Sequence, residues 1–235
     1  MTKSRERLAP EQIQRELADM AETLPILSLL GELFNDPKMF ESYSRFEKAG
    51  FALIEHAPHK IMTGGHKRVQ GYLFKKYNND KPDKKQLRNY MHRVEGSRLL
   101  RTFIAEHGFT RVIAPRKWLY ELPSTFPARY LVVAEKVDLV SRDATERAYA
   151  RIGKEQMAEL ATILYYFRGL NSTAQNLPYT EDGKIAFIDT ERWHHDKELL
   201  RKVGDRLSSD RRKQAEEVFR KLRSQGAQPF RASFK

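Results

Sequence analysis

The sequence predicts an α+β fold of two lobes, a β-rich N-terminal lobe over residues 1–138 and a reduced, mainly helical C-terminal lobe over residues 139–235. Runs rich in Val, Ile, Tyr and Phe gather before residue 136, whereas helical spacing of apolar residues dominates after residue 143. The length also matters, because 235 residues of which 40% are hydrophobic can bury a substantial core. A crevice between two such lobes is the natural place for a ligand.

The N-terminal lobe is predicted to begin with a helix over residues 10–35, which Pro25 kinks or splits. The spacing of Leu, Met and Val predicts one long helix over residues 84–107. The β-prone runs of this lobe are residues 51–55, 69–77, 111–115, 118–122 and 129–135. The stretch between the first two runs, which contains two adjacent glycines, is predicted to be a connection.

The C-terminal lobe is predicted to contain a buried helix, a hairpin and a helical tail. The apolar face of the buried helix comprises Met157, Leu160, Ala161, Leu164 and Phe167, and the helix ends at Gly169. Asp182-Gly183 predicts a hairpin turn between two short runs, residues 176–180 and 184–189. Residues 195–224 have the composition of a basic helix.

The charge of the chain favours an anionic partner. Lys and Arg outnumber Asp and Glu by 43 to 31, which gives a net charge of +12. Residues 197–235 hold twelve basic and five acidic residues, so the C-terminal tail carries most of the excess. A nucleotide, a nucleic acid, an inositol phosphate and an acidic lipid would all respond to this field.

Several other classes of protein are excluded or disfavoured. Cysteine is absent, which excludes disulfides, thiolate nucleophiles and cysteine-ligated metal clusters. No apolar run approaches the roughly 20 residues that a membrane-spanning helix needs. The basic start leads into a polar helix, so we expect a cytoplasmic protein. No G-x-S-x-G sequence supports a serine hydrolase, and the adjacent pair His194-His195 lacks the spacing of a zinc site.

Four segments carry the residues that could do chemistry. They are the strand Gly71–Lys76, the helical segment Arg93–Leu100, the strand Tyr130–Asp138 and the segment Gly169–Glu191. Taken alone, each also has a purely structural explanation. Adjacent lysines are common on exposed edge strands, and Glu95 could lie on a solvated helix face. Asn176 could cap a turn, and Asp189 could end a strand.

In this order, the four segments resemble the protein-kinase-like fold, in particular its small, atypical bacterial kinase and pseudokinase branches. The resemblance covers roughly residues 60–193 and implies ATP and Mg²⁺ as cofactors. It also implies a phosphate acceptor, either a protein or a small molecule, which the sequence does not identify.

In the N-terminal lobe, the resemblance implies that Lys75 neutralises the α- and β-phosphates of ATP and that Glu95 holds this lysine in place. Alternation along the strand puts Lys75 and Lys76 on opposite faces, so it leaves both open as the phosphate-binding lysine. The backbone of the following hinge would bind the adenine, and its residues are Ala134, Glu135 and Val137.

In the C-terminal lobe, Asn176 and Asp189 are in register with the two ligands that hold Mg²⁺ against the nucleotide phosphates, about a dozen residues apart. The position of the usual catalytic aspartate, five residues before Asn176, holds Asn171. An amide cannot take up the proton of a substrate hydroxyl, so the usual base is missing. Glu191 replaces the usual glycine and is a candidate for an extra metal-binding or proton-handling carboxylate.

Two further departures from the pattern concern the ends of the kinase-like segment. No G-x-G-x-x-G loop precedes Lys75, and only 46 residues follow Asp189. The leading hypothesis is an atypical kinase-like protein that binds ATP and Mg²⁺ between two lobes and transfers phosphate to an unknown acceptor. Two alternatives stay open: an inactive pseudokinase scaffold, and a basic module whose tail, with Arg211–Lys213 and Arg220–Arg223, binds nucleic acid or another polyanion.

Overall fold

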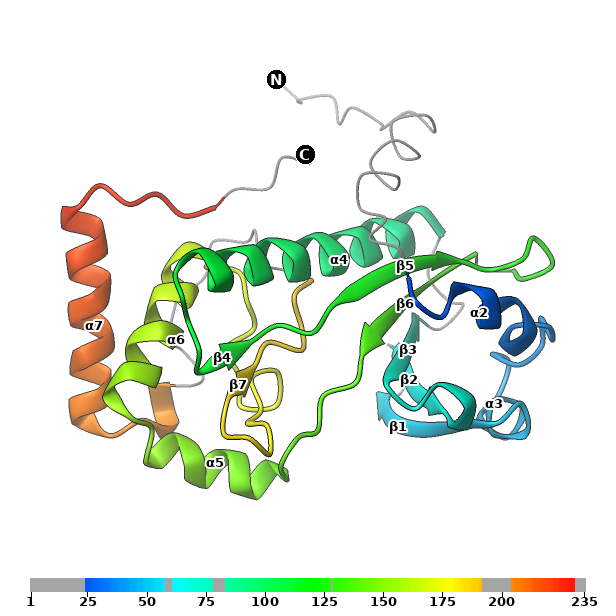
Figure 1. Ribbon diagram of the computed structural model, residues 1–235, viewed down its shortest axis with the longest axis horizontal. Coiled ribbons are helices and arrows are strands. Elements are labelled where there is room, and N and C mark those ends of the chain that lie inside the picture. Colours follow the sequence, from blue (N-terminus) through cyan, green and yellow to red (C-terminus); the bar gives the residue numbers. More distant parts are fainter. Residues whose placement is uncertain (1–23, 58–60, 78–82, 128, 192–203, 231–235) are drawn as a thin grey trace. The chain divides into compact units, whose positions relative to one another are not determined.

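The protein has an α+β fold with one mainly antiparallel sheet and several helices, as the sequence predicts at this level (Figure 1). The computed structural model describes residues 24–57, 61–77, 83–127, 129–191 and 204–230. Within this part of the chain, no helix has a stretch that is both long and apolar enough to cross a membrane.

The described chain divides into two compact units. The sheet unit comprises the chain up to Glu95 together with Arg116–Lys136, and the helical unit comprises Gly96–Pro115 together with the chain from Val137 onward. Helix α4 (Asp83–Glu106) contributes residues to both units. The units therefore interleave along the sequence, whereas the sequence predicts two continuous lobes that meet after residue 138.

The sheet unit is built on five antiparallel strands in the order β1-β2-β3-β6-β5. Their bounds are β1 (Phe51–Ala57), β2 (Ile61–His66), β3 (Tyr72–Tyr77), β5 (Lys117–Glu121) and β6 (Tyr130–Glu135). The prediction of a connection between the first two β-prone runs is wrong, because that stretch forms β2. The predicted strand 69–77 begins only at Tyr72, since Lys67–Val69 forms a 3-10 turn (η1) capped by the His66 ring.

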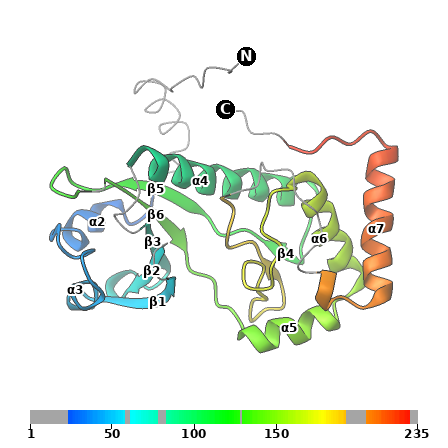
Figure 2. The ribbon, with the colours of Figure 1, turned by 180° about the vertical axis from the view of Figure 1, so that it is seen from behind.

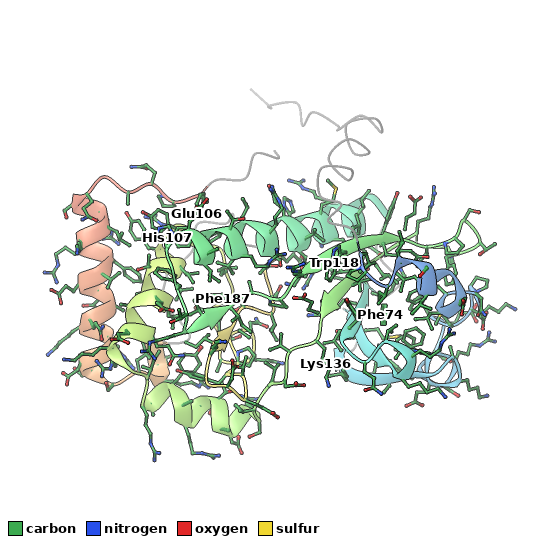
Figure 3. The ribbon with its side chains drawn as sticks, in the orientation of Figure 1. Phe74, Glu106, His107, Trp118, Lys136 and Phe187 are labelled. Atoms are coloured by element: carbon green, nitrogen blue, oxygen red, sulfur yellow. The ribbon has the colours of Figure 1, made fainter. Side chains whose placement is uncertain are left out.

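Aromatic side chains fill one face of this sheet. Helices α2 (Leu27–Leu33) and α3 (Tyr43–Lys48) belong to the same unit, and Phe34 follows α2 directly. The Phe34 ring lies 5.4–6.0 Å from the ring centroids of Phe40, Phe51, Phe74 and Tyr120. Phe74 and Trp118, labelled in Figure 3, belong to the same buried cluster. Truncation of such a buried ring to alanine typically costs about 3–5 kcal/mol.

The helical unit surrounds a second, smaller pairing of strands. Strands β4 (Val112–Ile113) and β7 (Ile185–Ala186) pair in parallel. The helices of this unit are α5 (Arg142–Ala150), α6 (Lys154–Tyr166) and α7 (Ser209–Ser224), with a 3-10 turn, η2 (Gly204–Arg206), before α7. Helices α6 and α7 pack together, as Figure 2 shows. Their core includes Leu160, Leu164, Phe187 and Phe219.

The helical unit confirms the predicted buried helix and refines the predicted tail. Helix α6 buries the predicted apolar face, and its regular part ends at Tyr166. In the described part of the tail, Ser208 starts a separate helix, because its hydroxyl accepts a hydrogen bond from the Arg211 N–H at 3.4 Å. The predicted strand 111–115 is shorter than expected and pairs with β7, not with the five-stranded sheet.

The two adjacent glycines of β2 differ in what surrounds them, which gives a stability test. A Cβ atom on Gly64 would lie 2.8 Å from Cζ of Phe46, whereas one on Gly65 would make ordinary contacts, the nearest at 3.6 Å from Leu73. We expect Gly64→Ala to destabilise the protein by about 1–3 kcal/mol, since the packed ring must move. Gly65→Ala should change stability by less than about 0.5 kcal/mol. Urea denaturation of both variants checks this, and equal losses would contradict it.

Candidate functional site

The cross-strand register assigns the side chains of the sheet to two faces. Gly64, Phe74, Val133 and Trp118 are paired in one row, on the aromatic face. The next row along the strands pairs Gly65, Leu73, Ala134 and Lys117. Because side chains alternate along a strand, this second row lies on the opposite face.

The register also distinguishes the two adjacent lysines of β3. Lys76 shares the aromatic face with Phe74, is only 3% exposed, and has its Nζ 5.7 Å from the centre of the Phe40 ring. Lys75 shares the opposite face with Leu73 and Tyr77. The two lysines therefore have different surroundings, which alternation alone does not reveal.

Helix α4 packs on the face that Lys75 shares. The Tyr77 N–H donates a hydrogen bond to the Tyr90 hydroxyl at 2.6 Å, and the two rings lie 5.0 Å apart. The Arg93 guanidinium lies 5.8 Å from the centre of the Tyr77 ring. These contacts place α4 beside the end of β3 that carries Lys75, so Lys75 points to the side of the sheet that α4 covers.

Glu95 is buried, not solvated. The residue is 4% exposed, and its Oε2 lies 4.0 Å from Nδ1 of His92 on the same helix. All eight residues from Tyr90 to Ser97 are buried, although several of them are polar or charged. Since a buried carboxylate is costly unless other groups stabilise it, the solvated-face explanation for Glu95 is wrong.

Sequence reasoning missed Lys117, a second lysine on the face that Lys75 shares. It is 4% exposed and is paired with Ala134 of β6. Lysine is rarely this buried. Lys117 and Leu119 share one face of β5, because side chains alternate along a strand, and this could have indicated that Lys117 points inward. A lysine at the start of a strand is usually solvated, however, so the local pattern favours the opposite prediction.

The predicted hinge begins within the last residues of β6 and is tied to its neighbours. The Glu135 N–H donates to the Arg116 carbonyl at 3.0 Å, and the Lys136 N–H donates to the Gly71 carbonyl at 2.8 Å. The Glu135 carboxylate accepts a hydrogen bond from the Arg116 N–H at 2.9 Å. Ala134 is 2% exposed within the sheet. Both N–H groups are thus bonded within the sheet unit, of which Lys136, labelled in Figure 3, is the last residue, and Val137 belongs to the helical unit.

The hairpin predicted around Asp182-Gly183 is present in the helical unit. Three backbone hydrogen bonds close it: Thr180 N–H to the Lys184 carbonyl at 2.8 Å, Ala186 N–H to the Pro178 carbonyl at 2.8 Å, and Ile188 N–H to the Asn176 carbonyl at 3.2 Å. Gly183 has a positive φ of 81°, which the turn requires and glycine adopts readily. Because Asp189 follows Ile188 directly, Asn176 and Asp189 lie together at the open end of the hairpin.

Backbone segments on both sides hold this hairpin in place. On one side, the Val140 N–H donates to the Tyr179 carbonyl and the Glu181 N–H to the Asp138 carbonyl, each at 3.0 Å. On the other side, the N–H groups of Ile185 and Phe187 donate to carbonyls of the 111–113 segment, at 3.0 and 2.9 Å. The hairpin is therefore an interior part of a small sheet and not a free loop.

The segments before and after the hairpin form turns. The Asn176 N–H donates to the Thr173 carbonyl at 2.9 Å and to its hydroxyl at 3.3 Å. After the hairpin, the Glu191 N–H donates to Oδ1 of Asp189 at 3.3 Å. Asn171, Asn176, Asp189 and Glu191 are all half-buried. The structure thus brings Asp189 and Glu191 into one turn beside Asn176.

The donor set at the open end of the hairpin fits Mg²⁺ bound together with phosphates. Asn176 offers an amide oxygen and Asp189 a carboxylate, and Mg²⁺ is commonly held by one or two such groups with substrate phosphates completing its shell. Among the described residues, no group of three or more His, Cys, Asp and Glu side chains could hold a metal by itself. The described residues therefore offer no all-protein metal cage at this end of the hairpin.

The histidines give no metal site in the part of the chain that can be described. His66 accepts a hydrogen bond from the Arg68 N–H through Nδ1 at 3.1 Å, and burial lowers the pKa of its ring. His66 is therefore a neutral cap of η1. His194 and His195 lie outside the described residues.

No protein-family model matches the chain, and no curated protein matches it either.

Proposed function

We propose that the chain is an atypical kinase-like protein that binds ATP and Mg²⁺ and transfers phosphate to an acceptor. One observation carries the proposal: the hydrogen bond from the Ile188 N–H to the Asn176 carbonyl, which brings Asn176 and Asp189 together. An amide oxygen and a carboxylate at one end of a rigid hairpin are a suitable pair of ligands for a phosphate-bound Mg²⁺ ion.

The sheet unit supports the proposal through the surroundings of Lys75 and Glu95. The long helix α4 follows β3 in sequence and covers the face that Lys75 shares. Glu95 is a buried carboxylate on that helix. In the proposed protein, Lys75 neutralises phosphate charge, and Glu95 limits the motion of Lys75, so that little reorganisation is needed when the nucleotide binds.

An apolar surface near Lys75 supports a site for a planar base. Gly65 and Ala134 have little or no side chain and lie on either side of Leu73 in one cross-strand row. Ile54 is 57% exposed, and its Cδ1 lies 3.8 Å from where a Cβ of Gly65 would be. Ala134 is buried and Leu73 half-buried, so Ile54 and Leu73 are the apolar side chains of this row that could contact a base.

In the proposed function, the protein and its cofactors supply different parts of the chemistry. Mg²⁺, when bound, neutralises charge on the phosphates and aligns them for transfer. Asn176 and Asp189 hold the ion, while Lys75 binds the phosphates. Positioning and charge neutralisation provide most of the acceleration in phosphate transfer, so a site with Asn171 in place of a base can retain activity. An inactive pseudokinase is the alternative that shares every binding residue.

The other alternative, a basic polyanion-binding module, finds less support on α7. The exposed basic residues of this helix include Arg212 and Arg220, and Glu216 lies between them at four-residue spacing on both sides. Pairs of opposite charge at this spacing interact along a helix. The exposed side of α7 therefore carries both signs of charge.

Nucleotide binding is tested by thermal unfolding with and without Mg-ATP. At about 100-fold the dissociation constant, Mg-ATP should stabilise the wild-type protein by about 2.7 kcal/mol. Asp189→Ala should lose most of this effect. Asp182→Ala is the matched control, because Asp182 lies at the exposed turn of the same hairpin. A wild type that does not respond contradicts nucleotide binding, and an Asp189→Ala variant that responds fully contradicts the metal role.

The two lysines of β3 should respond differently to substitution. Lys75→Met removes the proposed phosphate-binding charge, so the affinity for Mg-ATP should fall by at least about tenfold. Lys76→Met should leave it within about twofold, because Lys76 lies on the aromatic face. Titration with a fluorescent ATP analogue measures both. The reverse pattern would mean that Lys76 is the phosphate-binding residue.

The missing base can be supplied by substitution. Asn171→Asp places a carboxylate where the resemblance expects the catalytic residue, so ATP-dependent phosphate transfer should rise by about 10²-fold or more. Release of labelled phosphate from ATP, with water as the acceptor, measures the rate, with Asn171→Ala as the control. If the wild type binds Mg-ATP but neither it nor Asn171→Asp turns it over, the pseudokinase alternative holds and phosphate transfer is excluded.

A further inference from the structure

The segment that leads from Asn176 into the hairpin turn has two different sides. Toward its hairpin partner, the Pro178 carbonyl accepts a hydrogen bond from the Ala186 N–H at 2.8 Å. The Leu177 carbonyl and the Tyr179 N–H point to the other side, where no β-strand of the described chain pairs with them at these positions. A buried carbonyl or N–H group without a hydrogen-bond partner costs stability, so these two groups need partners other than a strand.

Helix α5 supplies these partners with two side chains. The Tyr149 hydroxyl donates a hydrogen bond to the Leu177 carbonyl at 2.7 Å, and the Thr145 hydroxyl oxygen accepts one from the Tyr179 N–H at 3.2 Å. The two residues are one helical turn apart, and they are 0% and 1% exposed. Figure 1 shows α5 beside the yellow segment that leads into β7. The Tyr149 and Thr145 side chains thus make the hydrogen bonds that a neighbouring strand would otherwise make.

The same tyrosine belongs to a buried network that extends to the hairpin turn. The rings of Tyr149 and Tyr179 meet edge to face with centroids 5.1 Å apart. The Tyr179 hydroxyl donates to Oε1 of Gln156 at 3.1 Å, and the Gln156 amide donates to the carbonyls of Arg111 and Gly183 at 3.0 and 2.9 Å. Burial raises the pKa of both tyrosines, so their hydroxyls stay protonated and act as donors.

Leu177 is the residue next to Asn176, so the bond from Tyr149 acts close to the proposed metal ligand. Asn176 is bonded through its own N–H to Thr173 and through its carbonyl to Ile188. The bond to Leu177 fixes the following peptide group. Together, these bonds determine where the Asn176 side chain starts and in which direction it can extend.

We propose that Tyr149 is a positioning residue that holds Asn176 in place for the metal-bound nucleotide. The inference rests on the proposed function. Without the hydroxyl, the buried Leu177 carbonyl loses its partner, and the 176–179 segment is free to shift toward or away from α5. A displaced Asn176 weakens binding of the nucleotide only when the metal is present, since metal-free ATP makes no use of this amide.

The test compares nucleotide affinity with and without metal. In the wild type, the ratio of the dissociation constant for ATP in EDTA to that for Mg-ATP measures the contribution of the metal contacts. Tyr149→Phe should lower this ratio about fivefold, the equivalent of one hydrogen bond, and should leave the affinity for metal-free ATP unchanged. A fluorescent ATP analogue measures both constants.

Tyr165→Phe is the matched control. The Tyr165 hydroxyl donates to the Ala227 carbonyl at 3.0 Å, and this residue is also buried, but its bond holds the segment after α7. The control should lower the melting temperature as Tyr149→Phe does, without changing the ratio. Thr145→Val, which removes the other bond from α5, should lower the ratio less than Tyr149→Phe and serves as the second variant if Tyr149→Phe does not fold.

The outcomes separate this inference from the proposed function. If the wild type binds no nucleotide, both are overturned. If the wild type binds Mg-ATP more tightly than ATP, but Tyr149→Phe and Thr145→Val keep the ratio of the wild type, the proposed function stands and the positioning role is overturned. If Tyr149→Phe lowers the affinity for ATP equally with and without metal, Tyr149 has only a structural role and the positioning role is overturned.

Discussion

The proposed chemistry depends on a backbone constraint, the closure of the hairpin between Asn176 and Ile188. Two residues with oxygen ligands become neighbours because the peptide groups between them pair, and that pairing is protected by segments on both sides. Hydrogen bonds that are buried and mutually supported resist local opening more than those of a surface loop. A metal ligand placed on such a frame loses little conformational entropy when the ion binds.

Burial of charge is the second constraint, and it concerns α4. A helix of the ordinary amphipathic kind keeps its charged residues in water, yet Glu95 and Arg93 are both buried here. The Arg93 guanidinium donates to the Tyr77 hydroxyl at 3.4 Å, and Ser97 donates to the Pro115 carbonyl at 2.5 Å. Such a polar interior costs stability that an apolar helix would not lose, which is typical of residues kept for function.

Sequence patterns predicted the hairpin and the position of Asn176 and Asp189, because an Asp-Gly turn is a strong local signal. They failed for β2, since two glycines lower strand propensity and only the packed Phe46 ring explains why a side chain is excluded at Gly64. They could not separate Lys75 from Lys76, because alternation gives two faces without saying what covers each. The burial of Glu95 and Lys117 also depends on tertiary neighbours, which no local pattern contains.

The interleaving of the two units has a consequence for dissection of the chain. The sheet unit draws β5 and β6 from the far side of Gly96–Pro115, a stretch that belongs to the helical unit. A fragment that stops after α4 would expose the edge of β3 that β6 pairs with, leaving a strand that invites aggregation. No single cut releases either unit whole, because each is built from separate stretches of the chain.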